Sequence, residues 1–404
     1  MMIQSKSIIF ILVTLSLSAL LSGCGVLSRN FNINLDVNSC PPTCVGVSLA
    51  GKDFSGRNLI GADFSDADLE RANFSGAQLN NVIFSGANLT SADLTNTDLS
   101  GVDFTSATLN SAKLSGSILD KANLNGADFT SAVLSRVDLE GIDVAGANFT
   151  KATLIGVQFN NASLNGVNFT GADLSGADLK GASLSGANLT NASLNGANMQ
   201  QAILTGAIMS EASIQGANLN NANMSGAQLQ HAAMVGSEMR GVDLTRANLQ
   251  TASLKGAALD GANLTAANLA GANLSGTIFT EAIFDQAIFS IKLNTGSTRV
   301  ATMNGASMPR ATFNGSCLRG AFFAGSNFNW VDLATADIQT GIPLSPNCSG
   351  IIQAAHLDGA YCNSEEQIAP NPIYICSCRT TDSSNNSAEQ QSGTADCVFE
   401  RRES

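Results

Sequence analysis

The sequence has few charged residues and few aromatic ones, and this scarcity excludes several classes of protein. Only 13% of its residues are charged, 5% are aromatic, and the two histidines are His231 and His356. The formal net charge of −12 argues against a nucleic-acid binder, because such proteins carry basic patches. An acidic balance keeps a protein soluble and permits a basic partner.

Catalytic motifs are also lacking. Serine is abundant, but neither histidine lies in a nucleophile motif such as G-x-S-x-G. His231 falls in an outward-facing position, and one histidine without partners makes no metal or catalytic site. The cysteine-rich tail offers no residues that would support an enzyme. We therefore expect no enzyme, no cofactor and no bound metal.

The N-terminus lacks an apolar run long enough to cross a membrane. The run from Ile8 to Leu21 follows Lys6 and is shorter than the roughly 20 residues that a spanning helix needs. It therefore fits the core of a signal peptide. The next residues, "LSGC" ending at Cys24, resemble a bacterial lipobox. The resemblance implies cleavage before Cys24, lipid on its thiol, and a place in the cell envelope, at the outer membrane in a cell with two membranes. The alternative is a plain secretory signal that happens to end in cysteine.

Without Cys24, the nine cysteines become an even set, which indicates a disulfide framework in an exported chain. Cys40 and Cys44 in "CPPTC" are candidates for a local pair. The "CSC" at Cys376 to Cys378 could be a redox or metal pair, but no histidine lies near it, and we favour a structural role. The sequence does not decide the pairing. The candidate disulfide cysteines are Cys40, Cys44, Cys317, Cys348, Cys362, Cys376, Cys378 and Cys397.

What the sequence has in abundance is a period of five. In "GADLSGADLKGASLSGANLTNASLNGAN" (171–198) a leucine or its equivalent falls at every fifth place, with an alanine two before it. These apolar centres run from Leu49 to Phe289 without a slip. Five fits neither an α-helix nor a strand, so it indicates a larger turning unit. Each pentapeptide predicts a short extended piece with two inward residues. A corner follows at the Gly, Asn or Ser two after the centre.

Stretches such as "ANLTNASLNGAN" and "ADLSGADLKGAS" resemble the A-(D/N)-L-x-x pentapeptide-repeat family. The resemblance implies an all-β fold, a right-handed quadrilateral β-helix with four pentapeptides per coil. About 15 coils would make a rod roughly 70 Å long at the spacing of hydrogen-bonded strands. Phenylalanines four repeats apart, such as Phe64, Phe84 and Phe104, or those from Phe129 to Phe169, would stack in ladders. A filled interior leaves no channel and no ligand pocket.

The array also suggests where the chain divides. Open ends of a β-helix invite aggregation and need caps. Near 290–300 the register slips, because Leu293 follows Phe289 by four residues, and the period of five then resumes from Leu293 through Met303 to Ile338. Thr298 is a poor member of this second run, and "NTGSTR" (294–299) suggests a loop. The predicted parts are a lipoprotein signal peptide (1–23), a lipid-anchored linker and N-cap (24–46), the pentapeptide-repeat β-helix (47–340) and a small Cys-rich C-terminal cap or tail (341–404).

One stretch places apolar residues in outward positions that Asn or Asp normally holds. The residues are Ile278, Ile283 and Ile288, on successive sides of nearly one coil. Three such residues predict a surface that something covers. The cover would be the 294–300 loop, the C-terminal segment, a partner or a second copy. We call these three residues the isoleucine patch.

Acidic residues concentrate in the early repeats, and some members of the family are described as DNA mimics that occupy DNA gyrase. Mimicry needs a regular line of negative charge, and DNA carries one charge per about 1.7 Å of its axis. Here the charges of one column would fall two coils apart, about 9.6 Å, which makes a sparse mimic. The two columns are Asp98, Ile118, Asp138, Gln158 and Asp178, and Asp63, Ile83, Asp103, Asn123 and Asp143.

These observations predict a non-enzymatic, lipid-anchored cell-envelope protein that acts as a rigid scaffold or protein-interaction module. The expected partners are the membrane, through the lipid anchor, and an unknown envelope protein, with a homo-oligomer as a further option and no nucleic acid. The alternative is a DNA-mimic regulator of a type II topoisomerase.

Overall fold

The computed structural model describes residues 43–292 and, with short gaps, residues 295–336, together with two strands farther along the chain. The named strands are β1 (Ser290–Lys292), β2 (Thr298–Val300), β3 (Tyr374–Cys378) and β4 (Cys397–Arg401). The rest of the described chain forms single-residue β-bridges and turns. The described residues are therefore all-β, and none of them belongs to a helix that could cross a bilayer. The predicted signal peptide and Cys24 lie outside the described residues.

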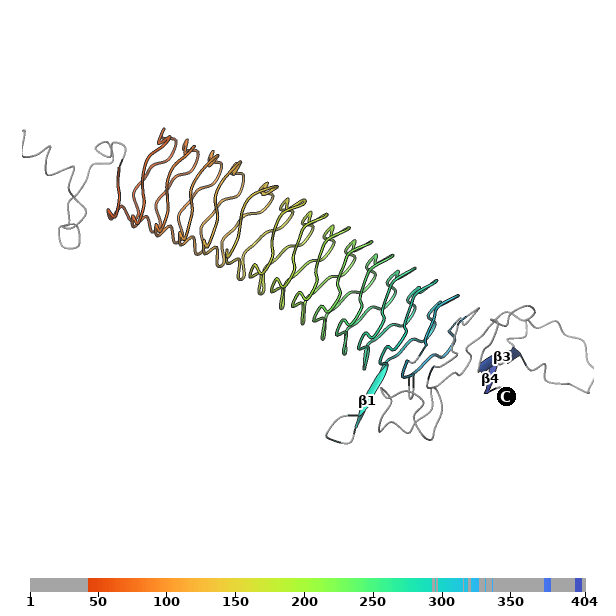
Figure 1. The fold of residues 1–404 in the computed structure, drawn as a ribbon. Helices are drawn as coiled ribbons and strands as arrows, with labels where there is room; N and C mark the ends of the chain where they lie inside the picture. Colours follow the sequence, from red (N-terminus) through yellow and green to blue (C-terminus); the bar gives the residue numbers. More distant parts are fainter. Residues whose placement is uncertain are drawn as a thin grey trace, which may run out of the picture.

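From residue 43 to residue 289 the chain winds in coils that stack along one axis (Figure 1). Parallel bridges join residues 20 positions apart, from Thr43↔Asp63 to Asn268↔Ile288. Backbone hydrogen bonds hold these contacts, in most cases two for each bridge. The Leu49 amide donates to the Asp68 carbonyl at 2.7 Å, and the Asp68 amide donates to the Val47 carbonyl at 3.0 Å. Four pentapeptides thus make one coil of a β-helix, as the family resemblance implies.

The corners lie two residues after each centre, as predicted. Every fifth residue from Gly46 to Gln286 has a positive φ. At Gly51, with φ 66°, the turn is closed by the Lys52 amide, which donates to the Leu49 carbonyl at 3.1 Å. Positive φ at the third residue is what a type II turn requires. Arg71 adopts the same backbone conformation (φ 56°), which costs about 1 kcal/mol or more for an L-residue with a side chain.

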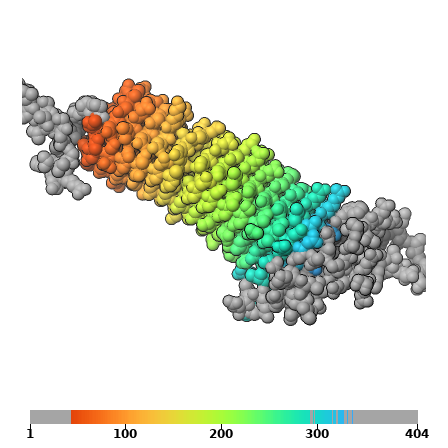
Figure 2. Space-filling view, in the orientation of Figure 1, coloured from red at the N-terminus to blue at the C-terminus, as the bar shows by residue number. Residues whose placement is uncertain are grey.

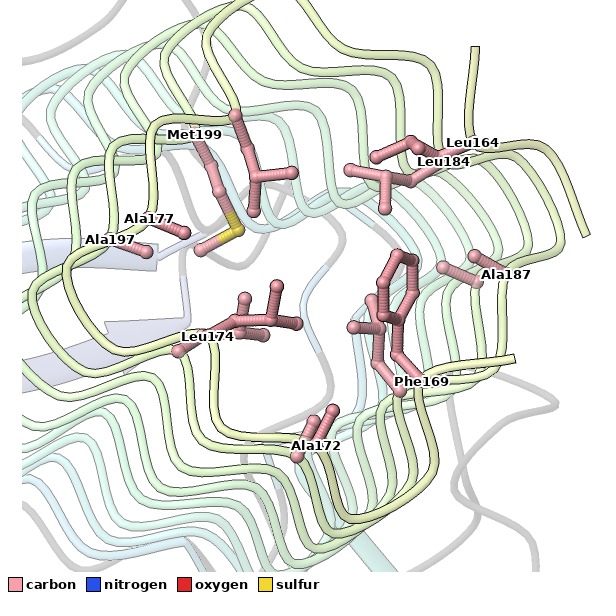
Figure 3. Packing of buried hydrophobic residues seen from close by; sticks show 14 of the residues in the cluster. Leu164, Phe169, Ala172, Leu174, Ala177, Leu184, Ala187, Ala197 and Met199 are labelled. Atoms are coloured by element: carbon pink, nitrogen blue, oxygen red, sulfur yellow. The ribbon is translucent and has the colours of Figure 1, made fainter. Parts of the chain in front are cut away.

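The interior is filled by the centres and by the small residues two before them. Leu174 and Ala172 are at most 1% exposed, and Figure 3 shows such side chains meeting inside the coils. The predicted phenylalanine ladder is confirmed: the rings of Phe64 and Phe84 stack at 5.5 Å, and those of Phe84 and Phe104 at 5.4 Å. The ladder from Phe129 to Phe169 also stacks, at 5.0 and 5.3 Å. The coils therefore form a solid rod (Figure 2).

Polar side chains form a second set of contacts on the outside of each coil. The carboxylate Oδ1 of Asp128 accepts the Thr130 amide at 3.0 Å and the Thr130 hydroxyl at 2.6 Å. Asn148, one coil on, donates from Nδ2 to the same Oδ1 at 3.0 Å. This pattern explains why Asn or Asp precedes a centre and Ser or Thr follows it: the pair closes the turn and links neighbouring coils.

A hairpin interrupts the coils after Phe289. β1 and β2 pair antiparallel, with Ser290 opposite Val300 and Lys292 opposite Thr298, and β1 leaves the side of the rod (Figure 1). Across the hairpin the spacing between bridged residues rises from 20 to 29, an insertion of nine, as in Ile288↔Cys317. Stacking then continues.

The predicted resumption of the period is confirmed from Met303 onward, where Met303, Met308 and Phe313 are buried centres, whereas Thr298, the poor member, is not a centre. Thr298 pairs in β2 and is exposed, while Leu293 lies outside the described residues. Met303 is the next buried centre. The hairpin satisfies its own backbone hydrogen bonds, so the extra residues can leave the rod while the coils on either side remain paired.

Candidate interaction surfaces

The isoleucine patch lies on the outside of the last regular coil. Ile278 is 42% exposed and Ile283 39% exposed, whereas Ile288 is half-buried and bridges to Cys317. One coil earlier the equivalent positions hold Ala258, Asn263 and Asn268. The patch is therefore a local change of surface chemistry on an unchanged backbone.

The corners beside the patch are held by side chains from the coil beyond the hairpin. Arg310 Nη1 lies 3.0 Å from Glu281 Oε1, and the Thr312 hydroxyl donates to Asp285 Oδ1 at 2.7 Å. The ion pair is well exposed and contributes little to stability. Together these contacts keep the backbone around Ile283 in place without covering its side chain.

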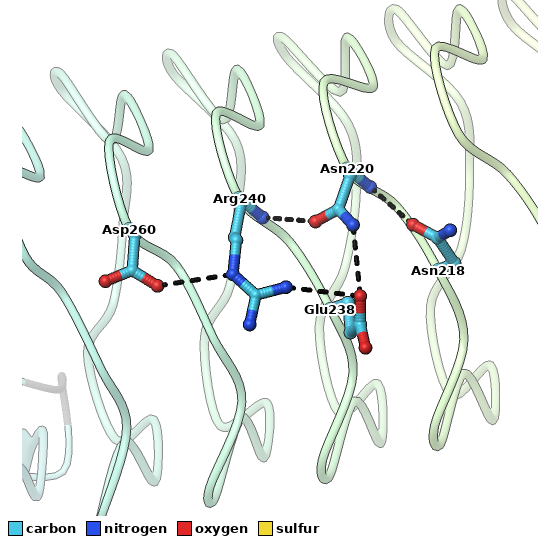
Figure 4. A network of polar contacts seen from close by, with 5 residues as sticks. All are labelled: Asn218, Asn220, Glu238, Arg240 and Asp260. Carbon is cyan, nitrogen blue, oxygen red and sulfur yellow. Dashed lines mark hydrogen bonds and ion pairs between the residues drawn. The ribbon is translucent and has the colours of Figure 1, made fainter.

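A separate polar network crosses three coils farther back (Figure 4). Arg240 reaches Glu238 Oε2 at 3.2 Å and Asp260 Oδ2 at 3.6 Å. Its backbone amide donates to Asn220 Oδ1 at 2.8 Å, and Asn220 Nδ2 donates to Glu238 at 3.1 Å. One arginine is shared by two carboxylates and every group drawn has a partner, so the network has the character of a structural brace.

The acidic columns stack much as the sequence suggested. Asp63 bridges to Ile83, Ile83 to Asp103, and Asn123 separates Asp103 from Asp143. In the other column Gln158 separates Asp138 from Asp178. Neutral residues therefore interrupt both lines of charge.

Several carboxylates of the early coils accept hydrogen bonds within the fold, and these bonds lower their pKa values. The hydrogen bond from the Ser100 side chain, followed by one from Asn80, lowers the pKa of Asp98. The Ser55 backbone amide is the main cause that lowers the pKa of Asp53. For Asp93, partial burial acts to raise the pKa, but hydrogen bonds from Thr95 and the charge of Lys113 outweigh it, and the pKa is lowered.

Histidine and acidic side chains are the candidates for a metal centre in the part of the chain that the structure describes. No group of three or more His, Cys, Asp or Glu side chains could hold an ion there. His231 is exposed, and its Nδ1 lies 2.7 Å from the Thr251 hydroxyl. His356 lies outside the described residues.

Of the candidate disulfide cysteines, Cys44 and Cys317 are each disulfide-bonded. Both are buried, at 4% and 0% exposure. Cys376 and Cys378 lie in β3, and Cys378 is opposite Cys397 of β4 in the register of that sheet. Cys40, Cys348 and Cys362 fall outside the described residues, and with Cys40 so does one half of the candidate local pair Cys40 and Cys44.

The sequence interpretation missed two features of the ends of the array. Lys52 and Arg57 occupy inward positions, two before the centres Phe54 and Leu59, where the next coil has alanine. A charged residue at that step of the repeat was the signal that could have revealed them. The Arg310–Glu281 pair had no such signal, because the hairpin sets its spacing.

Comparison with known proteins identifies the family. A model described as pentapeptide repeats matches in 8 copies, at residues 48–86, 83–120, 182–221, 222–260 and 257–290. A model of a pentapeptide repeat region matches residues 117–189. Together they cover residues 48–290, more than half of the sequence, and the chain belongs to the pentapeptide repeat family. No curated protein matches it.

Solved structures of pentapeptide repeat proteins are similar to this chain. HetL of the cyanobacterium Nostoc, involved in heterocyst differentiation regulation, is 23% identical over 70% of this chain and 91% of its own, with a TM-score of 0.25. Full-length QnrB1, a plasmid-mediated fluoroquinolone resistance protein, is 16% identical over 58% of this chain and 93% of its own, with a TM-score of 0.17. A protein of the Arabidopsis thaliana thylakoid lumen is 37% identical over 22% of this chain and 68% of its own, with a TM-score of 0.13. Since these scores lie below 0.5, membership rests on the family models and the repeat.

Proposed function

We propose that the protein is a non-enzymatic, lipid-anchored component of the bacterial cell envelope that acts as a rigid scaffold or interaction module. Its coils would wind as the right-handed quadrilateral β-helix of the family. Cys24 would hold the lipid, at the outer membrane in a cell with two membranes. The partner would be an envelope protein that docks on the isoleucine patch, or a second copy of this chain.

The observation that carries this proposal is the filled interior. Centres such as Leu174 and Phe169 are fully buried, and the coils bridge one another from Thr43 to Phe322. A rod without an internal cavity has no place for a substrate, but it holds its outer positions at fixed spacing. The disulfide-bonded Cys44 and Cys317 add support for an exported location, because disulfides persist in oxidising compartments.

Cell fractionation with fatty-acid labelling tests the anchor. Wild-type protein should carry the label and sediment with membranes, and Cys24→Ala should lose both. An unlabelled wild type in the cytoplasm would contradict the proposal. The alternative, a DNA-mimic regulator of a type II topoisomerase, would then come first and predicts inhibition of DNA gyrase by the purified chain.

The isoleucine patch is tested separately by Ile283→Asp. The side chain is exposed, so the rod should stay folded, with stability changed by no more than about 0.5 kcal/mol. Binding of an envelope partner, or self-association, should weaken. Asn263→Asp, at the same position one coil earlier, is the matched control. If the two variants keep the wild-type oligomeric state and co-purifying envelope proteins, the patch has no docking role.

A further inference from the structure

The N-terminal end of the rod is open on one side. Three apolar residues of the first coil are only half-buried, although their equivalents one coil later are at most 1% exposed. Within residues 43–336 no coil precedes the first one, so no described coil covers these side chains. The half-buried residues are Val47, Leu59 and Ala62, and the buried equivalents are Ala67, Leu79 and Val82.

The backbone of this first coil is also an edge. In the second coil the amides of Asp68 and Asn73 donate to carbonyls of the first, at 3.0 and 2.9 Å. The matching amides of the first coil, those of Ser48 and Asp53, have no preceding coil within residues 43–336. Such an edge favours pairing with one more strand.

Two cations make this end unsuitable for a second copy of the rod. Lys52 and Arg57 are half-buried in inward positions, where the next coil has Ala72 and Ala77. The Ser55 backbone amide is the main cause that lowers the pKa of Asp53, and Arg57 of the same coil is close enough to lower it further. Two rods stacked end to end here would still bring two lysines and two arginines together, with one aspartate from each copy, and like charges in contact are destabilising. Inward-pointing charges are a common protection of strand edges against self-association.

The sequence just before the first coil has the pattern of an amphipathic strand. In "NFNINLDVN" (30–38), Phe31, Ile33, Leu35 and Val37 alternate strictly with Asn and with Asp36. Alternation with a period of two indicates a strand with one apolar face. Asp36 is the only acid between Cys24 and Thr43, and it complements the charge of the two cations.

We propose that residues 30–38 lie across the N-terminal end of the rod as an added strand. Its apolar face would cover Leu59, Val47 and Ala62, and its backbone would pair with the open edge. The long side chains of Lys52 and Arg57 would reach past the strand to its polar face.

This docking would shorten the tether to the membrane, a consequence that rests on the proposed lipid anchor. With residues 30–38 docked, the spacer from Cys24 to Asn30 reaches at most about 20 Å. With the whole spacer to Thr43 free, the reach would be about 65 Å. The docked strand would therefore hold the end of the rod close to the bilayer.

Hydrogen exchange on the full-length chain in detergent tests the docking. Ile33→Asp and Leu35→Asp should speed exchange of the backbone amides of residues 48–62 by about tenfold, because the covering layer is lost. Asn34→Asp, which adds the same charge on the polar face, should leave exchange at the wild-type rate. Amides of residues 173–269 serve as the internal control for folding. If an Asp variant expresses poorly, Ile33→Ser makes the same test with a smaller change.

Two results would overturn the proposal. One is exchange in residues 48–62 that is the same in wild type, Ile33→Asp and Asn34→Asp. The other is a dimer, seen by light scattering, that Leu59→Asp dissociates and Ile33→Asp does not, since the occupant would then be a second copy. The docking and the lipid anchor are tested separately. Cys24→Ala removes the proposed lipid site but should leave the exchange of residues 48–62 at the wild-type rate, so a missing lipid does not count against the docked strand.

Discussion

Two neighbouring regions of the rod have the same five-residue period but differ in how completely their coils are joined by β-bridges. From Ser163 to Asn268 every outward position is bridged to the coil after it. In residues 118–143, which we call the loose seam, the bridges Ile118↔Asp138 and Asp143↔Ser163 are absent although all four residues are described. The period of five runs through both regions unchanged. A perfect repeat therefore does not guarantee perfect stacking.

The loose seam also shows defects in packing and charge. Ala122 and Ile142 are 5% and 6% exposed, whereas Ala172, in the well-bridged region, is 1% exposed. The buried Oδ1 of Asn125 has no hydrogen-bond partner. Asp120 and Glu140 directly follow the centres Leu119 and Leu139, so they hold the same turn position in successive coils, and like charges at such positions are destabilising. We infer that the seam is the least stable joint of the regular coils.

The largest expected effect comes from overpacking the interior. Ala172→Phe should destabilise the well-bridged region by about 1–3 kcal/mol or more, because no space is left beside the centres. Ala122→Phe should be milder, since the seam is already slightly open. Denaturant unfolding of both variants measures the difference. An equal loss of stability in the two variants would show that the interior is packed equally tightly in the two regions.

Hydrogen exchange of the wild-type chain should show the next largest effect. The Asn161 amide donates to the Lys180 carbonyl at 2.9 Å, but the equivalent bond from Lys121 to Glu140 is absent. The Lys121 amide should therefore exchange at least about tenfold faster than that of Asn161. Similar rates at the two corners would show that the coils close in solution.

A smaller effect should follow from removing the stacked acids of the seam. Glu140→Gln should raise the stability by about 0.2–1 kcal/mol, because it ends the repulsion from Asp120. Lys180→Gln, in the same column but in the well-bridged region, is the control and should change little. If Glu140→Gln destabilises the chain, the acid has a favourable contact that outweighs the repulsion.

The smallest effect should be a pH dependence confined to the early coils. Asp53, Asp93 and Asp98 have lowered pKa values in the folded chain, so their contribution to stability is present above the ordinary carboxyl pKa. It is lost as the pH falls through the lowered values. Protection factors, which correct for the intrinsic exchange rate at each pH, should fall first around residues 53–98 as the pH is lowered from 5. A first loss of protection around residues 173–269 would contradict this assignment.

Much of the fold could be predicted because the residues that determine the inward positions and the corner lie within each pentapeptide. Leu174 and Ala172 marked the inward positions and Gly171 the preceding corner, and the structure confirms all three. The isoleucine patch followed from the same register. The loop suggested at 294–299 agrees with the break in the array, but its form as a hairpin was not predicted, because the pairing of Thr298 with Lys292 is a contact between two strands. The sequence indicated that the acids suit turns, but the hydrogen bonds that close each turn, such as those of Asp128 with Thr130, became visible only in the structure.

The sequence by itself determined the coil, because an apolar centre, a small inward residue and a tolerant corner recur every five residues and act locally. Tertiary structure alone decided how well each coil meets the next. The seam at Asp120 and Glu140 arises from residues 20 apart that approach only after the chain has wound. The pairing of Arg310 with Glu281, 29 residues away, exists only because a hairpin leaves the rod between them. Contacts of this kind depend on stacking geometry, which the repeat does not encode.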